Sequence, residues 1–277
     1  MKLIHPDSLL FKEIVKSELS SFAEVSLMDA SLIEGNGKLP VKSIIASDNF
    51  EPAQVVAKLI STGVSSVLQK NKINFAHDLK QMSDYLQNPD NYFSQPSLNL
   101  IGPNVIATEV SFSTSLDKAN LKRVLETILT NVYNQNVIES AEAVVEELYM
   151  NAILDAPREA AKLGQVNCTY EVGLHATMRM ALSADRLVIS CEDPFGSLDA
   201  KKFVRRMNEV YVRGAGESIN FREGGAGLGC VIIFEHCEAL YLGVNPGQKT
   251  LVTVTIPVGL SYRQRAQIKK SLHLILK

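Results

Sequence analysis

The strongest constraint on the fold of this chain is a break in its periodic pattern between residues 88 and 104. Pro89, Pro96 and Pro103 fall in this segment among Asn, Ser and Gly residues, a composition that marks loops and interrupts regular structure. We therefore expect a linker over residues 88–104, with a folded unit on each side. A chain of 277 residues is long enough for two domains of ordinary size.

The first unit, residues 1–87, alternates strand-like and helical segments. Asp7 or Ser8 is suited to cap the first helix, and Pro52 suits the first turn of the second, where a missing N–H costs nothing. Strands that alternate with helices indicate a small parallel sheet, so we expect a small α/β domain. The expected strands lie at residues 3–4, 25–28, 43–46 and 64–68, and the last helix at 75–86.

The second unit begins with a strand-like run at residues 105–112 and places two helices before most of its strands. Helices on one side of a mixed, largely antiparallel sheet form an α+β layer, and we expect this fold class for residues 105–260. The tail, residues 261–277, is interpreted as a C-terminal amphipathic helix. The other expected strands lie at residues 167–174, 177–182, 186–191, 239–243 and 250–256.

Composition argues against several functional classes. The formal net charge of −2 gives no basic field for nucleic acid, and no apolar run is long enough to cross a bilayer. Residues 1–5 lead into a strand pattern rather than a signal peptide, and the four cysteines lack metal-binding spacing. We therefore expect a cytoplasmic protein with free thiols that binds neither nucleic acid nor membrane.

One helix, expected near residues 139–156, carries a polar stripe beside its apolar one. Glu147, Asn151 and Asp155 recur every four residues, so their side chains lie on one helix face. An Asn oxygen can coordinate Mg²⁺ and a carboxylate one turn away can accept a proton, two tasks that phosphoryl transfer requires. The alternative is an amphipathic surface helix whose polar stripe is solvated.

Two later segments carry further candidate residues. Asp193 ends an apolar strand, where a buried carboxylate can accept a hydrogen bond from an exocyclic amine such as adenine N6; the alternative is an ordinary turn Asp before Pro194. The glycines between Gly224 and Gly229 precede the apolar residues 230–234, so they place the free N–H groups of a helix start where phosphates can bind. The alternative is a glycine-rich surface loop.

The segment between these two is polar and basic. It could close over a triphosphate as a lid, or it could be a solvated helix and loop. Its basic residues are Lys201, Lys202, Arg205, Arg206, Arg213 and Arg222.

The ordered segments resemble the GHKL, or Bergerat-fold, ATPases and kinases, and among them most the anti-sigma-factor serine kinases. Glu147 and Asn151 match the family's N box. Asp193 matches its adenine-reading Asp, and Thr250 matches the Thr that supports that contact. The resemblance covers residues 105–260 and implies a Bergerat-type α/β sandwich that binds ATP and Mg²⁺, with Glu147 as catalytic base and Asn151 on the metal. The other residues implied at the nucleotide are Asp155, Gly196, Gly225, Gly227, Leu228 and Gly229.

The chain departs from the family pattern after Asp193. Phe195 and Ser197 occupy positions where the family usually has glycine, and Gly196 is the one glycine left there. Residues at these positions pack near the nucleotide in the family.

Residues 1–87 resemble a shortened response-regulator receiver. Residues 63–70 are similar to the receiver's last strand and its Lys, and Ser47 falls at the hydroxyl position. His5 and Pro6 stand where the acidic pair is expected, so the resemblance implies a pseudo-receiver that acts by contact. The alternative is an unrelated small α/β domain.

Together these features predict a signalling protein that binds ATP and Mg²⁺ and acts on a regulatory protein of the anti-anti-sigma or response-regulator type. It would be a serine/threonine-type protein kinase or a nucleotide-gated partner switch, and a homodimer is compatible with either role. Two alternatives stay open. One is a non-catalytic interaction module with the same fold, and the other is a histidine-kinase-like protein of a two-component system with His77 as phosphoacceptor.

Overall fold

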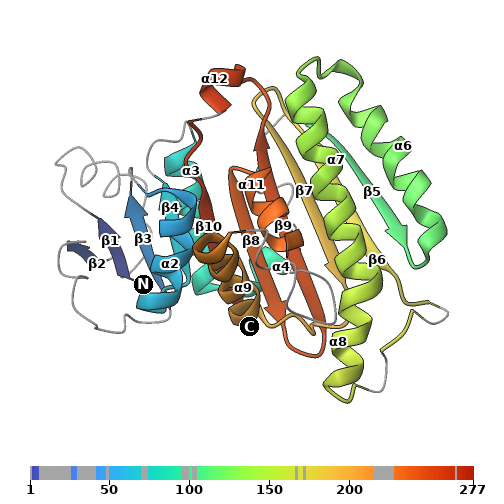
Figure 1. The fold of residues 1–277 in the computed structure, drawn as a ribbon, viewed down its shortest axis with the longest axis horizontal. Helices are drawn as coiled ribbons and strands as arrows, with labels where there is room; N and C mark the ends of the chain where they lie inside the picture. Colours follow the sequence, from blue (N-terminus) through green and yellow to red (C-terminus); the bar gives the residue numbers. More distant parts are fainter. Residues whose placement is uncertain are drawn as a thin grey trace.

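The computed structural model shows one ten-stranded sheet that runs through both halves of the chain (Figure 1). The strand order is β2-β1-β3-β4-β10-β8-β9-β7-β6-β5. The strands are β1 (Lys2–His5), β2 (Ser26–Asp29), β3 (Ser43–Ser47), β4 (Ser66–Gln69), β5 (Ile106–Phe112), β6 (Ala176–Leu182), β7 (Arg186–Asp193), β8 (Ala239–Asn245), β9 (Lys249–Pro257) and β10 (Ser271–Leu276). The structure describes residues 2–5, 26–29, 42–47, 50–69, 74–94, 100–101, 105–165, 168–170, 173–214, 228–265 and 267–277.

The pairing of the strands is mixed. β1 lies parallel to β2 and β3, and β3 lies parallel to β4, which is the parallel arrangement expected for the first half. In the second half, β5, β6, β7, β9 and β8 are antiparallel neighbours. β10 runs parallel to β8 and antiparallel to β4. The expected α+β class with a mixed sheet is confirmed.

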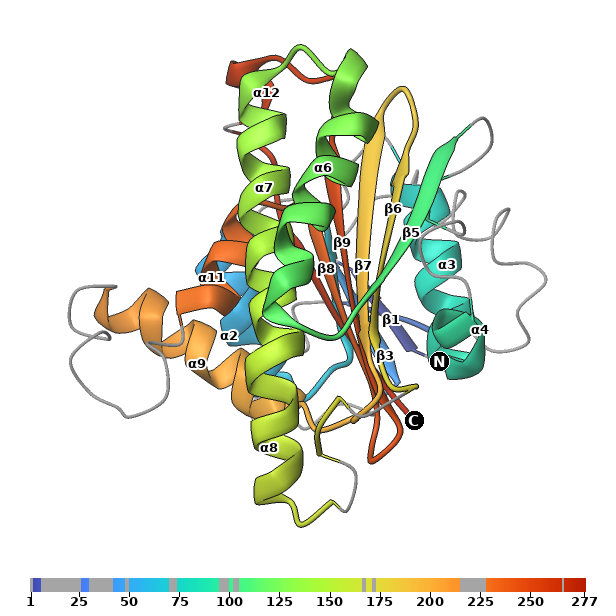
Figure 2. The ribbon, with the colours of Figure 1, turned by 90° about the vertical axis from the view of Figure 1, so that its right-hand side faces the viewer.

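Helices cover both faces of the sheet, which Figure 2 shows nearly edge-on. α6, α7, α9 and α11 lie over one face together with α2 from the first half, while α3 and α4 lie over the other. The helices of the second half thus keep to one side, and the first half supplies the cover on the opposite face. The helices are α2 (Pro52–Thr62), α3 (Phe75–Gln87), α4 (Pro89–Ser94), α6 (Lys118–Ile128), α7 (Gln135–Met150), α8 (Ala156–Lys162), α9 (Ala200–Arg213), α11 (Leu228–Glu235) and α12 (Tyr262–Arg265).

Alternation along the strands divides the buried side chains between two cores. In β7, Leu187 and Ile189 belong to the core on the side of α7, whereas Val188 belongs to the core on the side of α3. Val56 of α2 lies in the first core and Leu79 of α3 in the second, so both halves of the chain contribute to both cores.

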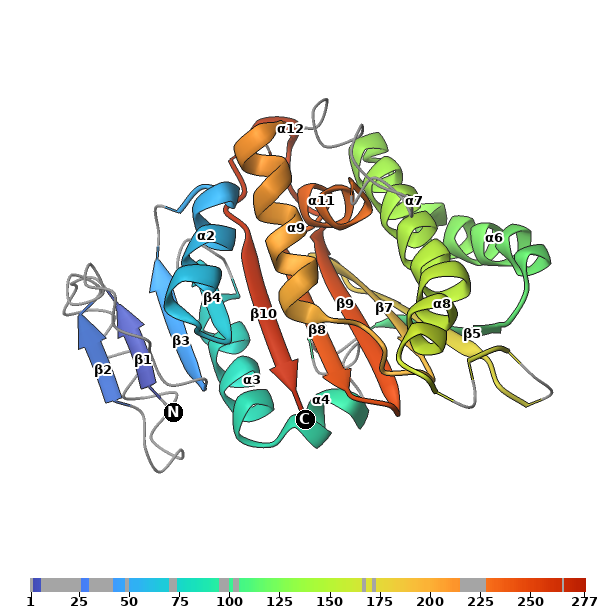
Figure 3. The same cartoon turned by 60° about the horizontal axis from the view of Figure 1, so that its bottom comes forward.

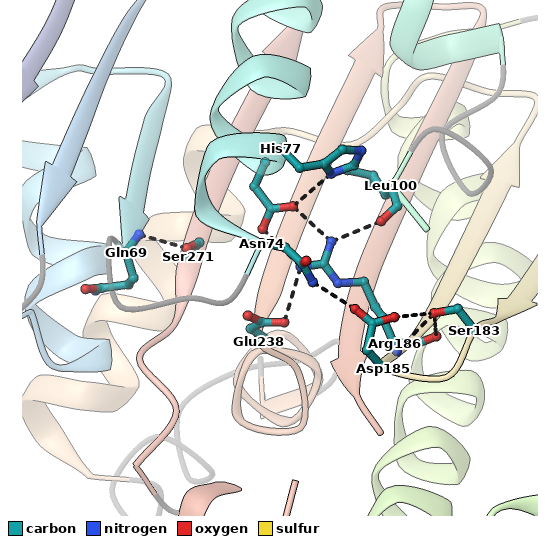
Figure 4. Close-up of polar contacts among 10 residues, drawn as sticks. Gln69, Asn74, His77, Leu100, Ser183, Asp185, Arg186, Glu238 and Ser271 are labelled. Carbon is teal, nitrogen blue, oxygen red and sulfur yellow. Dashed lines mark hydrogen bonds and ion pairs between the residues drawn. The ribbon is translucent and has the colours of Figure 1, made fainter. Parts of the chain in front are cut away.

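A buried ion pair fastens α3 to β7 (Figure 4). The guanidinium of Arg186 donates to both carboxylate oxygens of Asp78, at 2.9 and 3.1 Å, and to the carbonyl of Leu100 at 3.0 Å. The two charged side chains are 2% and 1% exposed, and Glu238 lies 3.7 Å from the guanidinium. Because Arg186 begins β7 and Asp193 ends it, this pair fixes the start of the strand whose end carries a candidate site residue.

The C-terminal helix expected over residues 261–277 is wrong. α12 is one short turn, and the chain then forms β10 between β4 and β8, in the middle of the sheet. Leu272, Leu274 and Ile275 are all buried. A strand covered on both faces is a nearly continuous apolar run, which periodicity does not separate from a buried helix. β10 also joins the two halves of the chain into one sheet.

The linker expected over residues 88–104 is in part a helix, α4, with a fixed place on the sheet. Tyr92 is fully buried, and its hydroxyl lies 2.9 Å from Thr253 Oγ1. A Cβ on Gly243 would collide with the Tyr92 ring, so this glycine makes room for it. Pro89 stands at the first helical position, where proline is tolerated. Its presence therefore marks the start of a helix here as well as a break.

The remaining expectations from the sequence have mixed outcomes. The helix expected at residues 75–86 is confirmed by α3. The strand expected at residues 167–174 is absent from the part of that segment that the structure describes. For the receiver resemblance, Ser47 ends β3 and is buried, while Lys70 falls outside the described residues. Among the helices described, none has both the length and the apolar character needed to cross a membrane.

Candidate functional site

A cavity of about 490 Å³ lies on the α7 side of the sheet, where β7 and β9 meet α7, α8, α9 and α11. Leu148, Cys191, Val252 and Ile233 provide apolar parts of its wall. This volume is within the range of sites that hold a small molecule or cofactor. The predicted site residues that line the cavity are Glu147, Asn151, Asp155, Asp193, Leu228, Gly229 and Thr250.

Three predicted site residues remain, Gly196, Gly225 and Gly227. Gly225 and Gly227 lie outside the described residues. Gly196 has a positive φ of 58°, and a Cβ there would collide with the carbonyl of Asn245 in the β8–β9 hairpin. The N–H of Gly247 donates to Gly196 O at 3.2 Å. Gly196 therefore serves the turn next to this hairpin, and it is not among the residues that line the cavity.

The helix that carries the polar stripe is interrupted at its centre by a π turn. α7 ends at Met150, residues Asn151–Asp155 form the π turn, and α8 continues from Ala156, whose N–H bonds to Asn151 O. Pro157 lies at the start of α8 and has no N–H for a regular i→i−4 bond, which accounts for the wider turn. Such turns often occur at functional sites. Asn151 and Asp155 both remain on the cavity side.

Glu147 lies in the last turn of α7, opposite the start of α11. Its carboxylate is so close to Gly229 that a Cβ at position 229 would collide with Oε2. Burial raises the pKa of Glu147 above its ordinary value, and the nearby carboxylates of Glu146 and Asp155 act in the same direction. A carboxylate with a raised pKa is a better proton acceptor than a fully solvated one.

Asp193 and Thr250 form a polar end of the cavity. Asp193 is 8% exposed, and burial raises its pKa to about 6, while a hydrogen bond from the N–H of Phe195 at 3.0 Å acts the other way. Thr250 is the cross-strand neighbour of Asp193 in the β7–β9 register. Its hydroxyl is near enough to lower the pKa of Asp193, yet within the described structure no partner of good geometry reaches this buried oxygen. Both residues can therefore serve a polar ligand.

The segment after Asp193 is packed rather than open. Phe195 is buried and meets Tyr170 edge to face, with ring centroids 5.1 Å apart. The Ser197 hydroxyl donates to Ala156 O at 2.8 Å, which ties the segment to the start of α8, and Ser197 lines the cavity. Both residues that replace glycine thus hold packed positions, and Ser197 is the one that lines the cavity.

α9, which belongs to the basic segment considered as a lid from the sequence, forms a wall of the cavity. Its N-cap Asp199 accepts a hydrogen bond from the N–H of Lys202 at 2.9 Å. Lys202, Phe203 and Arg206 line the cavity from this helix. A basic run in the sequence signals a charged segment, but it does not tell which side chains face inward. Figure 3 shows α9 lying between α2 and α11, and it packs against both.

The residues present fit a magnesium ion bound together with a phosphate ligand. In the described ranges, no three His, Cys, Asp or Glu side chains are grouped so as to hold a metal. Mg²⁺ usually takes one or two protein ligands and completes its shell with water and phosphate oxygens. Asn151 on the cavity wall suits this mode, whereas Asp155 is partly neutralised by Arg158 at 2.6 Å.

The comparisons with known proteins find likenesses among solved structures. No protein-family model matches the chain, and a search of curated proteins found no match. A chain from the SiaB–SiaC complex of Pseudomonas aeruginosa is similar at 16% identity, with a TM-score of 0.37. The similarity covers 63% of this chain and 98% of that one. At this level, a candidate function has to rest on the geometry of the site.

Proposed function

We propose that this protein binds ATP with Mg²⁺ in the 490 Å³ cavity and acts as a phosphotransferase or nucleotide-gated switch on a regulatory protein. The observation that carries the proposal is the convergence on one cavity of three segments far apart in sequence. Glu147 and Asn151 come from one helix, Asp193 from the end of β7, and Gly229 from the start of α11. Their order and chemistry are those of the GHKL resemblance.

The adenine base would bind at the polar end of the cavity, which Asp193 and Thr250 form. An ionised Asp193 accepts a hydrogen bond from the exocyclic amine of adenine, and guanine presents an oxo group there that cannot donate. The buried Thr250 hydroxyl offers one further hydrogen bond. Leu148, Cys191 and Val252 supply apolar contact for the ring.

The phosphates would lie toward α11. Its first turn presents backbone N–H groups, and the absence of a Cβ at Gly229 leaves room for the Glu147 carboxylate beside it. Asn151 would hold Mg²⁺, which when bound neutralises charge on the phosphate oxygens. Glu147 would accept the proton of a serine or threonine hydroxyl as that oxygen bonds to the terminal phosphorus and the bond to ADP breaks.

A non-catalytic interaction module is the second candidate. The observation that favours it is the closed packing of Phe195 and Ser197, which replace residues that are small in the family. Phosphate transfer to a partner, or ADP release, in wild type and Glu147→Gln separates the two. Loss of a proton acceptor lowers turnover by about 10²- to 10⁴-fold. If ATP binds and both proteins are equally inactive, the module is the better description.

A histidine-kinase role is less well supported. His77 lies on α3, on the sheet face opposite the cavity, beside Asp78 at 3.6 Å. Transfer from the cavity to His77 within one chain would have to pass the sheet. Acid-labile label on wild type that is lost in His77→Gln would revive this role.

Calorimetric titration with ATP, ADP and GTP in the presence of Mg²⁺ tests the proposal. We expect heat with both adenine nucleotides and much weaker binding of GTP. Asp193→Ala should abolish the preference for adenine. No binding of either adenine nucleotide at high micromolar protein would overturn the proposal.

A further inference from the structure

Helix α9 carries two pairs of adjacent cations, and one member of each pair lines the cavity. The pairs are Lys201 with Lys202 and Arg205 with Arg206. Lys202 and Arg206 line the cavity, whereas Lys201 and Arg205 do not. In each pair, therefore, only the second residue is in a position to meet a ligand.

The helix geometry explains the selection. Lys202 and Arg206 are four residues apart, so both side chains lie on one face of α9. Phe203, between them in sequence, also lines the cavity. Val204 and Met207 are buried in the core shared with α2 and α11, which fixes the rotation of the helix. The direction of the two cations is thus set by packing and does not depend on a ligand.

Neither inward cation has a carboxylate partner among the residues that the structure describes. Arg158, the third cation of the cavity, is paired with Asp155 at 2.6 Å. Across the residues that the structure describes, neither Lys202 nor Arg206 forms an ion pair within 4.0 Å. Two unpaired cations beside a cavity attract an anion.

Electrostatic neighbours place the two cations along the cavity. Burial raises the pKa of the Cys230 thiol to about 12, and the charge of Arg206 acts the other way, so Arg206 lies near the first turn of α11. The pKa of Glu159 is lowered, mainly by its hydrogen bond with Lys162 and less by the charge of Lys202, so Lys202 lies toward α8. Arg206 is therefore the cation nearer the start of α11, which lies against Glu147.

The carboxylates of the cavity set where an anion can sit. Those that line it are Glu147, Asp155, Glu159, Asp193 and Asp199. Asp199 is used at the α9 N-cap, and Glu159 and Asp155 have cationic partners on α8. Glu147 faces the α11 start without such a partner among the residues described, so a phosphate placed there needs a nearby cation. Arg206 can supply this positive charge.

We propose that Arg206 binds the terminal phosphate groups of the nucleotide from the α9 side, with Lys202 as a second phosphate contact one turn nearer the base. The inference rests on the proposed nucleotide site and adds to it the residues that distinguish a polyphosphate from a nucleoside. Arg offers several donors in a planar fork that matches phosphate oxygens, and charge-assisted bonds of this kind are the strong ones.

The test compares Arg206→Ala with Arg205→Ala, and Lys202→Ala with Lys201→Ala, in the full-length protein. Each pair removes the same chemical group one residue apart. Calorimetry with ATP, ADP, adenosine and inorganic tripolyphosphate, the first two with Mg²⁺, gives the dissociation constants. We expect Arg206→Ala to weaken ATP and tripolyphosphate binding about 10- to 100-fold, with little effect on adenosine. Arg205→Ala should change all four by less than about threefold.

The outcomes separate this inference from the proposed function. If ATP binds and Arg205→Ala weakens it as much as Arg206→Ala does, the effect is general charge and the inference fails alone. If Arg206→Ala weakens adenosine equally, the side chain supports the fold rather than the phosphates, which thermal unfolding of the variant would also show. Suppose that tripolyphosphate binds through Arg206, that adenosine does not bind, and that ATP binds no more tightly than tripolyphosphate. The proposed adenine site then fails and the phosphate site stands. If no ligand binds wild type, both fail.

Discussion

Replacement of Asp193 by Asn should make the ligand-free protein more stable at neutral pH. The folded-state pKa of about 6 compares with about 4 for a solvated Asp, so the ionised form is disfavoured by folding. A difference of roughly two units corresponds to about 3 kcal/mol. The carboxyl is almost fully buried, so this figure needs little reduction for solvent screening. Asn keeps the oxygen that accepts from Phe195 N–H and carries no charge.

The sign of the pH dependence follows from the raised pKa. Below about pH 4, Asp193 is neutral in both the folded and unfolded states, and its contribution to stability is fully present. As the pH rises through the folded-state pKa near 6, that contribution is lost. Between pH 4.5 and pH 8, wild type should therefore lose about 2 kcal/mol relative to Asp193→Asn. For a chain of this length, that is about 3 °C in unfolding temperature.

Thermal or urea unfolding of both proteins at several pH values measures the difference. Subtracting one curve from the other removes the titration of all groups that the substitution leaves unchanged. Asp185→Asn is the matched control: the pKa of Asp185 is lowered, first by its hydrogen bond with Ser183, so its contribution is lost as the pH falls and the slope has the opposite sign. A wild-type-minus-Asp193→Asn difference that is flat from pH 4.5 to pH 8 would refute the reasoning.

Three further predictions follow from contacts described above. Asp78→Ala leaves the buried guanidinium of Arg186 without its carboxylate and should destabilise the protein by about 3–5 kcal/mol in urea unfolding. Glu109→Ala, which removes the carboxylate of a more exposed pair, should cost under about 1 kcal/mol. Equal costs would contradict a stabilising role of the buried pair. Gly229→Ala should push the Glu147 carboxylate aside and lower turnover with little change in unfolding temperature, because the end of a side chain gives way more easily than backbone; unchanged turnover in an active protein would speak against it. Truncation after residue 270 removes β10 and should abolish cooperative unfolding, seen by circular dichroism; a truncated chain that unfolds like wild type would disprove this.

The candidate site was largely predictable because it depends on local rules. Helical spacing places Glu147 and Asn151 on one face whatever the rest of the fold does. Asp193 follows an apolar run and so stands where a strand ends. These residues do line one cavity. Their chemical roles remain predictions.

The parts that sequence reasoning missed depend on distant contacts. β10 is a buried apolar run, and only its neighbours β4 and β8 decide that it is a strand. The inward direction of Lys202 and Arg206 depends on how α9 packs between α2 and α11. Pro157 does signal a disturbance in the helix, yet a π turn that keeps Asp155 at the cavity does not follow from the proline alone.

The central place of β10 has a consequence for the order in which the chain assembles. β10 follows both β4 and β8 in sequence, so the two halves of the sheet cannot join before β10 has been synthesised. Until then, the facing edges of β4 and β8 are unpaired, and such edges invite association with other chains. Contacts between residues as far apart as Ser66 and His273, whose side chains lie 2.7 Å apart, also slow folding. Completion of this sheet therefore waits for the synthesis of β10, and until then the nascent chain depends on protection of these two edges.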